Sequence, residues 1–324
     1  MKAITQDVYG GPEVLKLEEI ERPTIGDDEV LVRVRAAGVD PGVWHLMTGR
    51  PYLVRLFGFG VFKPKAKVRG LDVAGVVEAV GAKVTRFRPG DEVFGNCDGA
   101  FAEFARAKEE VLIHKPAGLS FEEAAVIPVS AATALAAVRD VAKVQPGQSV
   151  LVIGAAGGVG GYATQLAKAM GAEVTGVCSG AKAEFVRQLG ASHVVDYTRE
   201  DFTASGKRYD VIIDTVSNRS LSELRSALTP KGTLAVIGGE GGGSILGMMR
   251  RVFAALLLAP FVSQSLKPVS SFVKQPALVS LVELIVAGKL KAPLGKVWRL
   301  EEAGAAIAEL ANGHARGKSV IAVG

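Results

Sequence analysis

A glycine-rich turn between an apolar run and a helical pattern is the part of the chain whose residues most directly suggest chemistry. The apolar run 150–153 leads into Gly154-Ala155-Ala156-Gly157-Gly158-Val159-Gly160, and a helical pattern over 162–170 and a second apolar run over 174–177 follow. Such a strand, turn, helix and strand unit presents free backbone N–H groups at a helix start, where a pyrophosphate can approach closely. Gly157 and Gly160 match the second and third fingerprint glycines of dinucleotide sites, and Ala155 replaces the first. A glycine turn of another α/β protein would fit the turn taken alone.

The end of the second apolar run indicates which dinucleotide is preferred. An Asp or Glu about 20 residues after the glycines would bond the ribose 2'-hydroxyl of NAD. The chain instead reads Cys178-Ser179-Gly180-Ala181-Lys182, without an acid. A hydroxyl and an ammonium there favour the extra phosphate of NADPH. The alternative for Lys182 is a solvated lysine in the first turn of the next helix.

The first third of the chain has the pattern of a β-rich domain. Short strand-like runs separated by turn formers cover residues 2–5, 29–37, 75–80, 92–94, 101–107 and 111–114. Strands of this length and spacing predict a small irregular barrel. A helix is then predicted to begin at Ser120 and to run over 121–141 with a break near Pro128.

From Gln148 onward, predicted strands alternate with helices. After the first unit we expect a helix over 181–189, strands over 193–195 and 211–214, a helix over 220–228, a turn over 229–232 and a strand over 233–237. This alternation predicts a parallel sheet covered on both faces, with ligands beyond the carboxyl ends of its strands. The tail predicts a helix over 276–287, a strand over 296–299, a helix over 301–310 and a last strand over 319–323.

Length and composition limit the class of protein. A chain of 324 residues with 48% hydrophobic and 22% charged residues predicts an ordinary globular protein of two domains. Its net charge is +5, and the Lys and Arg residues are scattered with Asp and Glu between them. Attraction for an anionic cofactor is a sufficient explanation of this charge, and no nucleic acid partner is indicated. Two distant cysteines, Cys97 and Cys178, fit a reducing, cytoplasmic setting and could not form a four-ligand structural zinc site. The N-terminal residues lack a signal-peptide core, and no apolar run reaches the ~20 residues of a spanning helix.

The segment 248–262 is an apolar helix candidate with three open interpretations. It could form a dimer or domain contact, a lid over a substrate, or a surface that touches a membrane. Contact with protein is favoured because the apolar run is short and ends at Pro260 and Phe261.

Six motifs in order resemble the medium-chain dehydrogenase/reductase superfamily, in its zinc-free quinone oxidoreductase-like branch. They are Gly38-Val39-Asp40-Pro41, Gly70-Leu71-Asp72-Val73-Ala74-Gly75-Val76-Val77, Arg88-Pro89-Gly90-Asp91-Glu92-Val93, Gly99-Ala100-Phe101-Ala102-Glu103, the 155–160 turn and His314-Ala315-Arg316-Gly317-Lys318. The resemblance implies an α/β protein with a GroES-like irregular β-barrel catalytic domain, residues 1–120 and 275–324. It also implies a Rossmann NADP-binding domain with a doubly wound parallel sheet, residues 121–274, and a homodimer.

The branch follows from the residues that replace the zinc ligands of related enzymes. By this resemblance Asp40, Leu71-Asp72 and Val129 occupy the ligand places, and carboxylates do not replace thiolate and imidazole ligands. Without a Lewis acid, oxidation of an alcohol is disfavoured, and hydride transfer from NADPH to a quinone or an α,β-unsaturated carbonyl is implied. The alternatives are a zinc-independent alcohol dehydrogenase, an NADPH-binding scaffold and a peripheral membrane quinone reductase.

The resemblance also implies roles for individual residues. The pyrophosphate is implied to contact Ala156, Gly157, Gly158, Val159 and Gly160, and the 2'-phosphate to contact Ser179, Lys182 and Tyr197. The nicotinamide is implied to lie near Asp40 and Thr133, with Gly238 and Gly239 on its far side. Lys318 is implied to close over the cofactor.

Two catalytic candidates, Asp40 and Tyr52, keep alternative interpretations. Relatives usually carry Asn in place of Asp40, and a carboxylate beside the nicotinamide would favour the oxidised ring. The alternative for Asp40 is an Asx-turn residue that caps the turn at Pro41. The Tyr52 phenol could bond an acceptor oxygen, or the ring could simply pack in a surface loop. His45 could relay a proton or be structural, and quinones can also take their proton from water.

Overall fold

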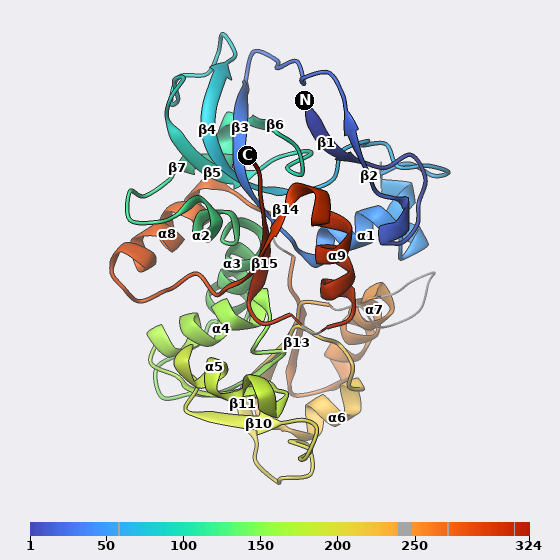
Figure 1. Ribbon diagram of the computed structural model, residues 1–324. Coiled ribbons are helices and arrows are strands. Elements are labelled where there is room, and N and C mark those ends of the chain that lie inside the picture. The colour runs from blue at the N-terminus through green and yellow to red at the C-terminus, as the bar shows by residue number, and fades with distance from the viewer. Residues whose placement is uncertain (58, 239–247, 271, 314) are drawn as a thin grey trace. The chain divides into compact units, whose positions relative to one another are not determined.

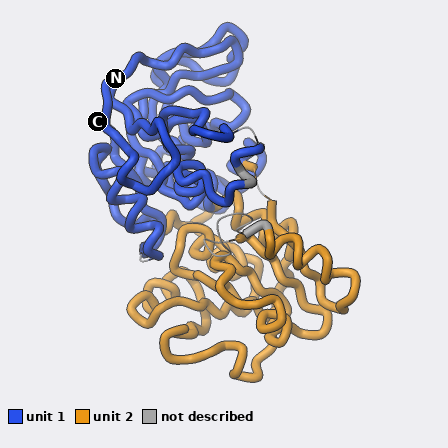
Figure 2. Tube along the Cα trace, turned by 90° about the vertical axis from the view of Figure 1, so that its right-hand side faces the viewer, with its two compact units in different colours: residues 1–130, 273–286, 294–324 blue, residues 131–272, 287–293 orange. Residues whose placement is uncertain are grey.

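The computed structural model spans the chain and describes all residues except 58, 239–247, 271 and 314. The chain forms two compact units (Figure 2): unit 1 is Met1–Ser130, Val273–Val286 and Leu294–Gly324, and unit 2 is Ala131–Phe272 and Ala287–Pro293. The sequence predicts domain bounds at 120/121 and 274/275, and it assigns residues 287–293 to the first domain, whereas these residues lie in unit 2. The assignment of catalytic and cofactor-binding roles to the two domains stays a prediction.

Unit 2 is built on a six-stranded parallel sheet (Figure 1). Its strands are β8 (Ser149–Ile153), β9 (Glu173–Cys178), β10 (His193–Asp196), β11 (Tyr209–Asp214), β12 (Leu228–Val236) and β13 (Ser265–Pro268), in the order β10-β9-β8-β11-β12-β13. The order reverses at β8, which is the arrangement of a doubly wound dinucleotide-binding sheet. The predicted Rossmann sheet is therefore confirmed.

One local prediction in unit 2 is wrong, and one strand was not predicted. The predicted turn over 229–232 lies within β12, where the register with β11 shifts between Tyr209 and Val211. Its Pro and Gly are accommodated at this irregularity rather than at a chain reversal. The sequence analysis also missed β13, because Ser265–Pro268 contains a lysine and a proline at the edge of the sheet.

Helices pack on both faces of this sheet. The helical elements are α3 (Pro128–Leu135) with a π-helix over Ala136–Val141, α4 (Gly158–Ala169), η5 (Gly180–Lys182), α5 (Ala183–Gln188), α6 (Leu221–Ser226), α7 (Met248–Leu258) and η6 (Ala259–Phe261). α4 contacts β8 and β9, α5 contacts β9 and β10, α6 contacts β12, and α7 contacts β13. The sheet's apolar residues, such as Leu151, Ile212 and Leu234, are fully buried between them.

Unit 1 contains a mixed sheet of the GroES-like kind. The order is β14 (Leu294–Arg299), β15 (Lys318–Ala322), β3 (Glu29–Gly38), β4 (Asp72–Val80), β5 (Glu92–Asn96) and β7 (Leu112–His114), and β6 (Phe104–Lys108) also pairs with β3. β14 and β15 are parallel and the other pairs antiparallel, while β1 (Lys2–Thr5) and β2 (Lys16–Glu19) form a separate hairpin. Gly38 of β3 pairs with both Val320 and Asp72, so the chain's end and its first third meet at this point.

The helices of unit 1 are short except near the C-terminus. They are η1 (Pro12–Val14), α1 (Pro41–Thr48), η2 (Tyr52–Phe57), η3 (Glu109–Val111), α2 (Phe121–Ala125), α8 (Gln275–Val286), η7 (Leu300–Glu302) and α9 (Ala303–Ala311). The predicted helix start at Ser120 is confirmed: its hydroxyl and the Glu123 carboxylate form a capping box. α1 was not predicted, because Gly38-Val39-Asp40-Pro41 suggested a turn and not a helix start. Within the described ranges, no helix has the length and apolarity to cross a membrane.

Candidate functional site

The glycine turn of unit 2 connects β8 to α4 at the carboxyl end of the sheet. Gly157 is the N-cap of α4 in extended conformation, and no side chain occupies the capping position. The first intrahelical bond is donated by the Gly161 N–H to the Gly157 carbonyl, so the preceding N–H groups of Gly158, Val159 and Gly160 have no helical partner. These donors and the helix dipole fit a pyrophosphate, which supports the predicted placement of the cofactor.

The structure also shows why two other turn positions carry glycine. Gly154 has a φ of 79°, a left-handed conformation that a side chain disfavours, so it makes the tight turn that Ala155 does not. A Cβ on Gly160 would overlap the Gly154 carbonyl oxygen and lie 2.7 Å from its carbon. The third fingerprint glycine therefore lets α4 pack closely on the turn.

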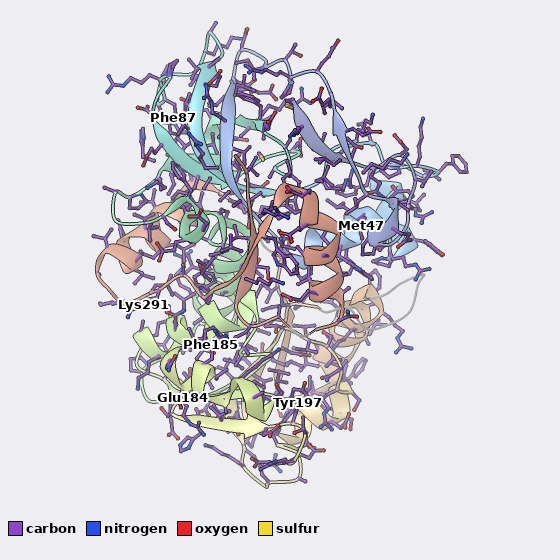
Figure 3. All side chains as sticks on the ribbon, in the orientation of Figure 1. Met47, Phe87, Glu184, Phe185, Tyr197 and Lys291 are labelled. Atoms are coloured by element: carbon purple, nitrogen blue, oxygen red, sulfur yellow. The ribbon has the colours of Figure 1, made fainter. Side chains whose placement is uncertain are left out.

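The predicted 2'-phosphate residues lie at the ends of neighbouring strands. Ser179 follows β9, Lys182 ends η5, and Tyr197, labelled in Figure 3, follows β10 with 58% of its surface exposed. Parallel strands end at one edge, so the structure groups these residues with the glycine turn. Their contact with a cofactor stays a prediction.

An acid also reaches this edge, and the sequence analysis missed it. The Asp196 carboxylate accepts the Gly180 N–H, and its Oδ2 would overlap a Cβ placed on Gly180. Hydrogen bonds from the Thr198 hydroxyl and N–H are the main cause that lowers the pKa of Asp196, so it is ionised at neutral pH. The premise that no acid lies beyond β9 is true of the segment 178–182 but not of the folded edge, because β10 contributes Asp196.

Three further predicted positions belong to unit 2. Thr133 is partly buried on α3, and Gly238 follows β12 with a φ of 98°. Gly239 lies outside the described residues. The roles predicted for all three stay predictions.

A buried ion pair fixes the loop after β11. Asp214, 1% exposed, pairs with Arg251 of α7 at 3.0 Å and accepts the backbone N–H groups of Val216 and Ser217. Arg251 also donates to the Ser217 carbonyl oxygen. The start of segment 248–262 is thereby bound to the carboxyl end of its own sheet, while Leu257 and Phe261 are largely exposed. The three interpretations of the segment stay predictions.

In unit 1 the predicted site residues Asp40 and Lys318 meet at a third charged residue, Asp72. Lys318 is 3% exposed and its ammonium donates a hydrogen bond to the Asp72 carboxylate. Both Asp72 oxygens also accept the Val129 N–H, at 3.1 and 3.2 Å. The sequence analysis treated Asp72 only as half of a replaced ligand pair, because its partner lies 246 residues away.

Asp40 caps α1 and faces the same ammonium. Its Oδ1 accepts the Gly42 N–H at 2.8 Å, which confirms the Asx-turn interpretation. Among the described residues its buried Oδ2 has no hydrogen-bond partner, and it lies 3.9 Å from the Lys318 Nζ. One Asp40 oxygen therefore stabilises the start of α1, and the other accepts no hydrogen bond from the described residues. The predicted catalytic role of Asp40 stays a prediction.

The cluster of Asp40, Asp72 and Lys318 holds two carboxylates and one ammonium away from water. Burial is the main cause that raises the pKa of Asp72 from 3.8 to about 6; Lys318 opposes the rise and Asp40 adds to it. Asp72 thus takes up a proton more readily than an ordinary aspartate. The three groups form one buried cluster of ionisable side chains in unit 1.

The other donor candidates have their own local partners. Tyr52 is 41% exposed, and the Arg55 guanidinium lies 4.6 Å from the centre of its ring. His45 Nδ1 is 2.9 Å from the Arg50 carbonyl oxygen, and burial lowers the pKa of its imidazole. Neither residue's predicted role is tested by these contacts.

Comparisons with known proteins agree with this architecture. Residues 26–117 match the family described as alcohol dehydrogenase GroES-like domain, and residues 189–321 match the family described as zinc-binding dehydrogenase. A chloroplastic quinone-oxidoreductase, QR1 from Triphysaria versicolor, is 33% identical over 99% of this chain and 98% of its own. The structure of the quinone oxidoreductase from Coxiella burnetii has a TM-score of 0.88 at 30% identity, covering 100% of this chain and 99% of that one. A mycobacterial protein solved with NADPH has a TM-score of 0.85 at 26% identity, covering 99% of both chains.

Together the two units define a nicotinamide-dependent dehydrogenase fold. The chain belongs to the medium-chain dehydrogenase/reductase superfamily, in its quinone oxidoreductase branch, as the sequence motifs predict. It is accordingly an oxidoreductase.

Proposed function

We propose that the chain reduces quinones or α,β-unsaturated carbonyls with NADPH and without zinc. The glycine turn supports coenzyme binding, because its unpaired N–H groups and absent side chains fit a pyrophosphate. The similarity to quinone oxidoreductases over the whole chain supports the acceptor class.

The observation that carries the metal-free proposal is the position of the Lys318 ammonium. It hydrogen-bonds Asp72 and lies 3.9 Å from Asp40, at two of the places where zinc-dependent relatives hold the metal. A fixed cation between these carboxylates neutralises the donors and repels a dication. Leu71 and Val129 supply no ligand side chains. The family description that mentions zinc covers residues 189–321, which include none of Asp40, Leu71, Asp72 and Val129.

The coenzyme would supply a hydride to the acceptor. The α4 N-terminus would hold its pyrophosphate, which fixes the position of the nicotinamide end. The Lys318 ammonium would keep Asp40 and Asp72 in place and reduce their negative field. The proton for the reduced acceptor would come from water or from the Tyr52 phenol.

We propose NADPH rather than NADH because of the charged and polar side chains that follow β9. Lys182 and the Ser179 hydroxyl would face the 2'-phosphate, with Tyr197 from the next strand. The neighbouring Asp196 favours a ribose 2'-hydroxyl instead, which makes NADH the second candidate. The similarity to a structure solved with NADPH supports the first choice.

The test is turnover by purified protein. NADPH absorbance is followed with a panel of quinones and enones, and the reverse reaction is tried with NADP⁺ and simple alcohols. We expect an acceptor to oxidise NADPH at a rate that a chelator does not lower. We expect no oxidation of alcohols. Turnover that a chelator abolishes and zinc restores would disprove the metal-free mechanism. Coenzyme binding without turnover across the panel would favour a scaffold instead.

A further inference from the structure

A pocket of about 450 Å³ lies within unit 1, between α1 and the loop that leads into β4. Its apolar wall includes Val43 and Leu46 of α1, and Val68 and Leu71 from the loop. A volume of this size suits a small organic molecule. The pocket is built from unit 1 alone, so it does not depend on the coenzyme.

One residue that lines the pocket is a buried cation without an ion-pair partner among the described residues. Arg69 is among the lining residues, yet it is only 4% exposed. One of its nitrogens, Nη2, donates to the Ala66 carbonyl oxygen, while Nε is buried and has no hydrogen-bond partner among the residues that the structure describes. No carboxylate of the described residues forms an ion pair with it. Burial lowers the pKa of Arg69, but a guanidinium stays protonated, so the charge must be tolerated or matched by a ligand.

Two more cations line the same pocket. Lys65 and Arg106 are exposed, and neither forms an ion pair within the part of the chain that the structure describes. Among the described lining residues Asp98 is the one acid, so the pocket is lined by three cationic residues and one carboxylate. A concave site with this excess of positive charge attracts anions.

We propose that this pocket binds an organic carboxylate. Its carboxylate pairs with the Arg69 guanidinium, whose planar fork matches that group, and its apolar body lies against Val43 and Leu71. Lys65 and Arg106 strengthen the attraction at the rim. The proposal does not rest on the quinone or enone reductase activity.

Isothermal titration of the full chain, without coenzyme, tests the proposal with naphthalene-2-carboxylate and its neutral amide. The two probes share shape and apolar area and differ in charge. We expect the carboxylate to bind at least about tenfold more tightly than the amide, because hydrogen bonds to charged groups are the stronger kind. Equal affinities, or no binding of the acid at millimolar concentration, would overturn the proposal.

Variants separate this site from general surface charge. Arg69→Met should abolish the preference for the acid and raise the melting temperature, since it removes an unpaired buried charge. Arg106→Gln should weaken binding of the acid by about threefold, as expected for a rim charge. Lys63→Gln, on the loop that carries Lys65 but outside the pocket, should not weaken it. Asp98→Asn leaves Arg69 intact and should tighten binding. An unchanged preference in Arg69→Met, or equal losses in Arg106→Gln and Lys63→Gln, would contradict the assignment.

Discussion

The glycine turn of unit 2 and the charge cluster of unit 1 are built from different kinds of chemical group. The glycine turn of unit 2 offers backbone N–H groups, and its key residues are those that lack side chains. The cluster of Asp40, Asp72 and Lys318 in unit 1 offers buried charges, and each depends on a partner from a distant part of the chain. The turn is local and uncharged, and we expect its loss to impair coenzyme binding and to lower stability. The charge cluster joins distant parts of the chain, and we expect its loss to impair the fold itself.

The largest effect is expected from breaking the charge cluster. Lys318→Met leaves Asp40 and Asp72 buried without their cation and should lower the free energy of unfolding by about 3–5 kcal/mol. The exposed pair of Lys83 and Asp27 is the matched control, and Lys83→Met should cost at most about 1 kcal/mol. Urea denaturation measures both. Similar losses in the two variants would show that burial does not distinguish these pairs.

The pH dependence of stability should report on Asp72. Its pKa rises from 3.8 to about 6 in the fold, so between these values the unfolded chain has lost a proton that the folded chain keeps. The free energy of unfolding should therefore fall as the pH rises through this window and stay level above it. Relative to Asp72→Asn, which cannot titrate, the loss should reach about 3 kcal/mol at most. Parallel urea profiles of the two proteins between about pH 4 and pH 8 would refute the raised pKa.

The glycine turn should respond in both stability and coenzyme affinity. A Cβ on Gly160 would overlap backbone of Gly154, so Gly160→Ala should cost about 1–3 kcal/mol and weaken NADPH binding. Gly118→Ala is the control, because a Cβ at Gly118 meets nothing within 4 Å. Calorimetry of unfolding and fluorescence titration of NADPH measure the two effects. Unchanged coenzyme affinity in Gly160→Ala would separate the turn from the cofactor site.

The smallest expected effect concerns the choice of coenzyme. Lys182→Gln should weaken NADPH binding by about tenfold and leave NADH binding unchanged, since only NADPH carries the 2'-phosphate that we propose this charge contacts. Asp196→Asn should shift the preference further toward NADPH. Dissociation constants of both coenzymes for each variant provide the check. Equal weakening of NADPH and NADH by Lys182→Gln would place that lysine elsewhere.

The elements that could be predicted from the sequence are those that neighbouring residues determine. The strand, turn and helix around Gly157 and the helix start at Ser120 follow from neighbouring residues, and both are confirmed. Asp72 and Asp196 were missed as functional candidates because each acquires its role from a residue in another element. β13 was missed because an edge strand with lysine and proline lacks the apolar run that marked the other strands of the sheet. A search for acids at the ends of all neighbouring strands would have found Asp196.

The central claim, metal-free hydride transfer from NADPH to an electrophilic acceptor, can be measured with isotope-labelled coenzyme. Chelator-treated, zinc-depleted protein is incubated with an α,β-unsaturated ketone and NADPH that carries deuterium at both C4 positions, and the product is analysed by mass spectrometry. The account predicts deuterium on the β-carbon of the saturated product. Product without deuterium, or transfer that occurs only after zinc is added, would contradict it.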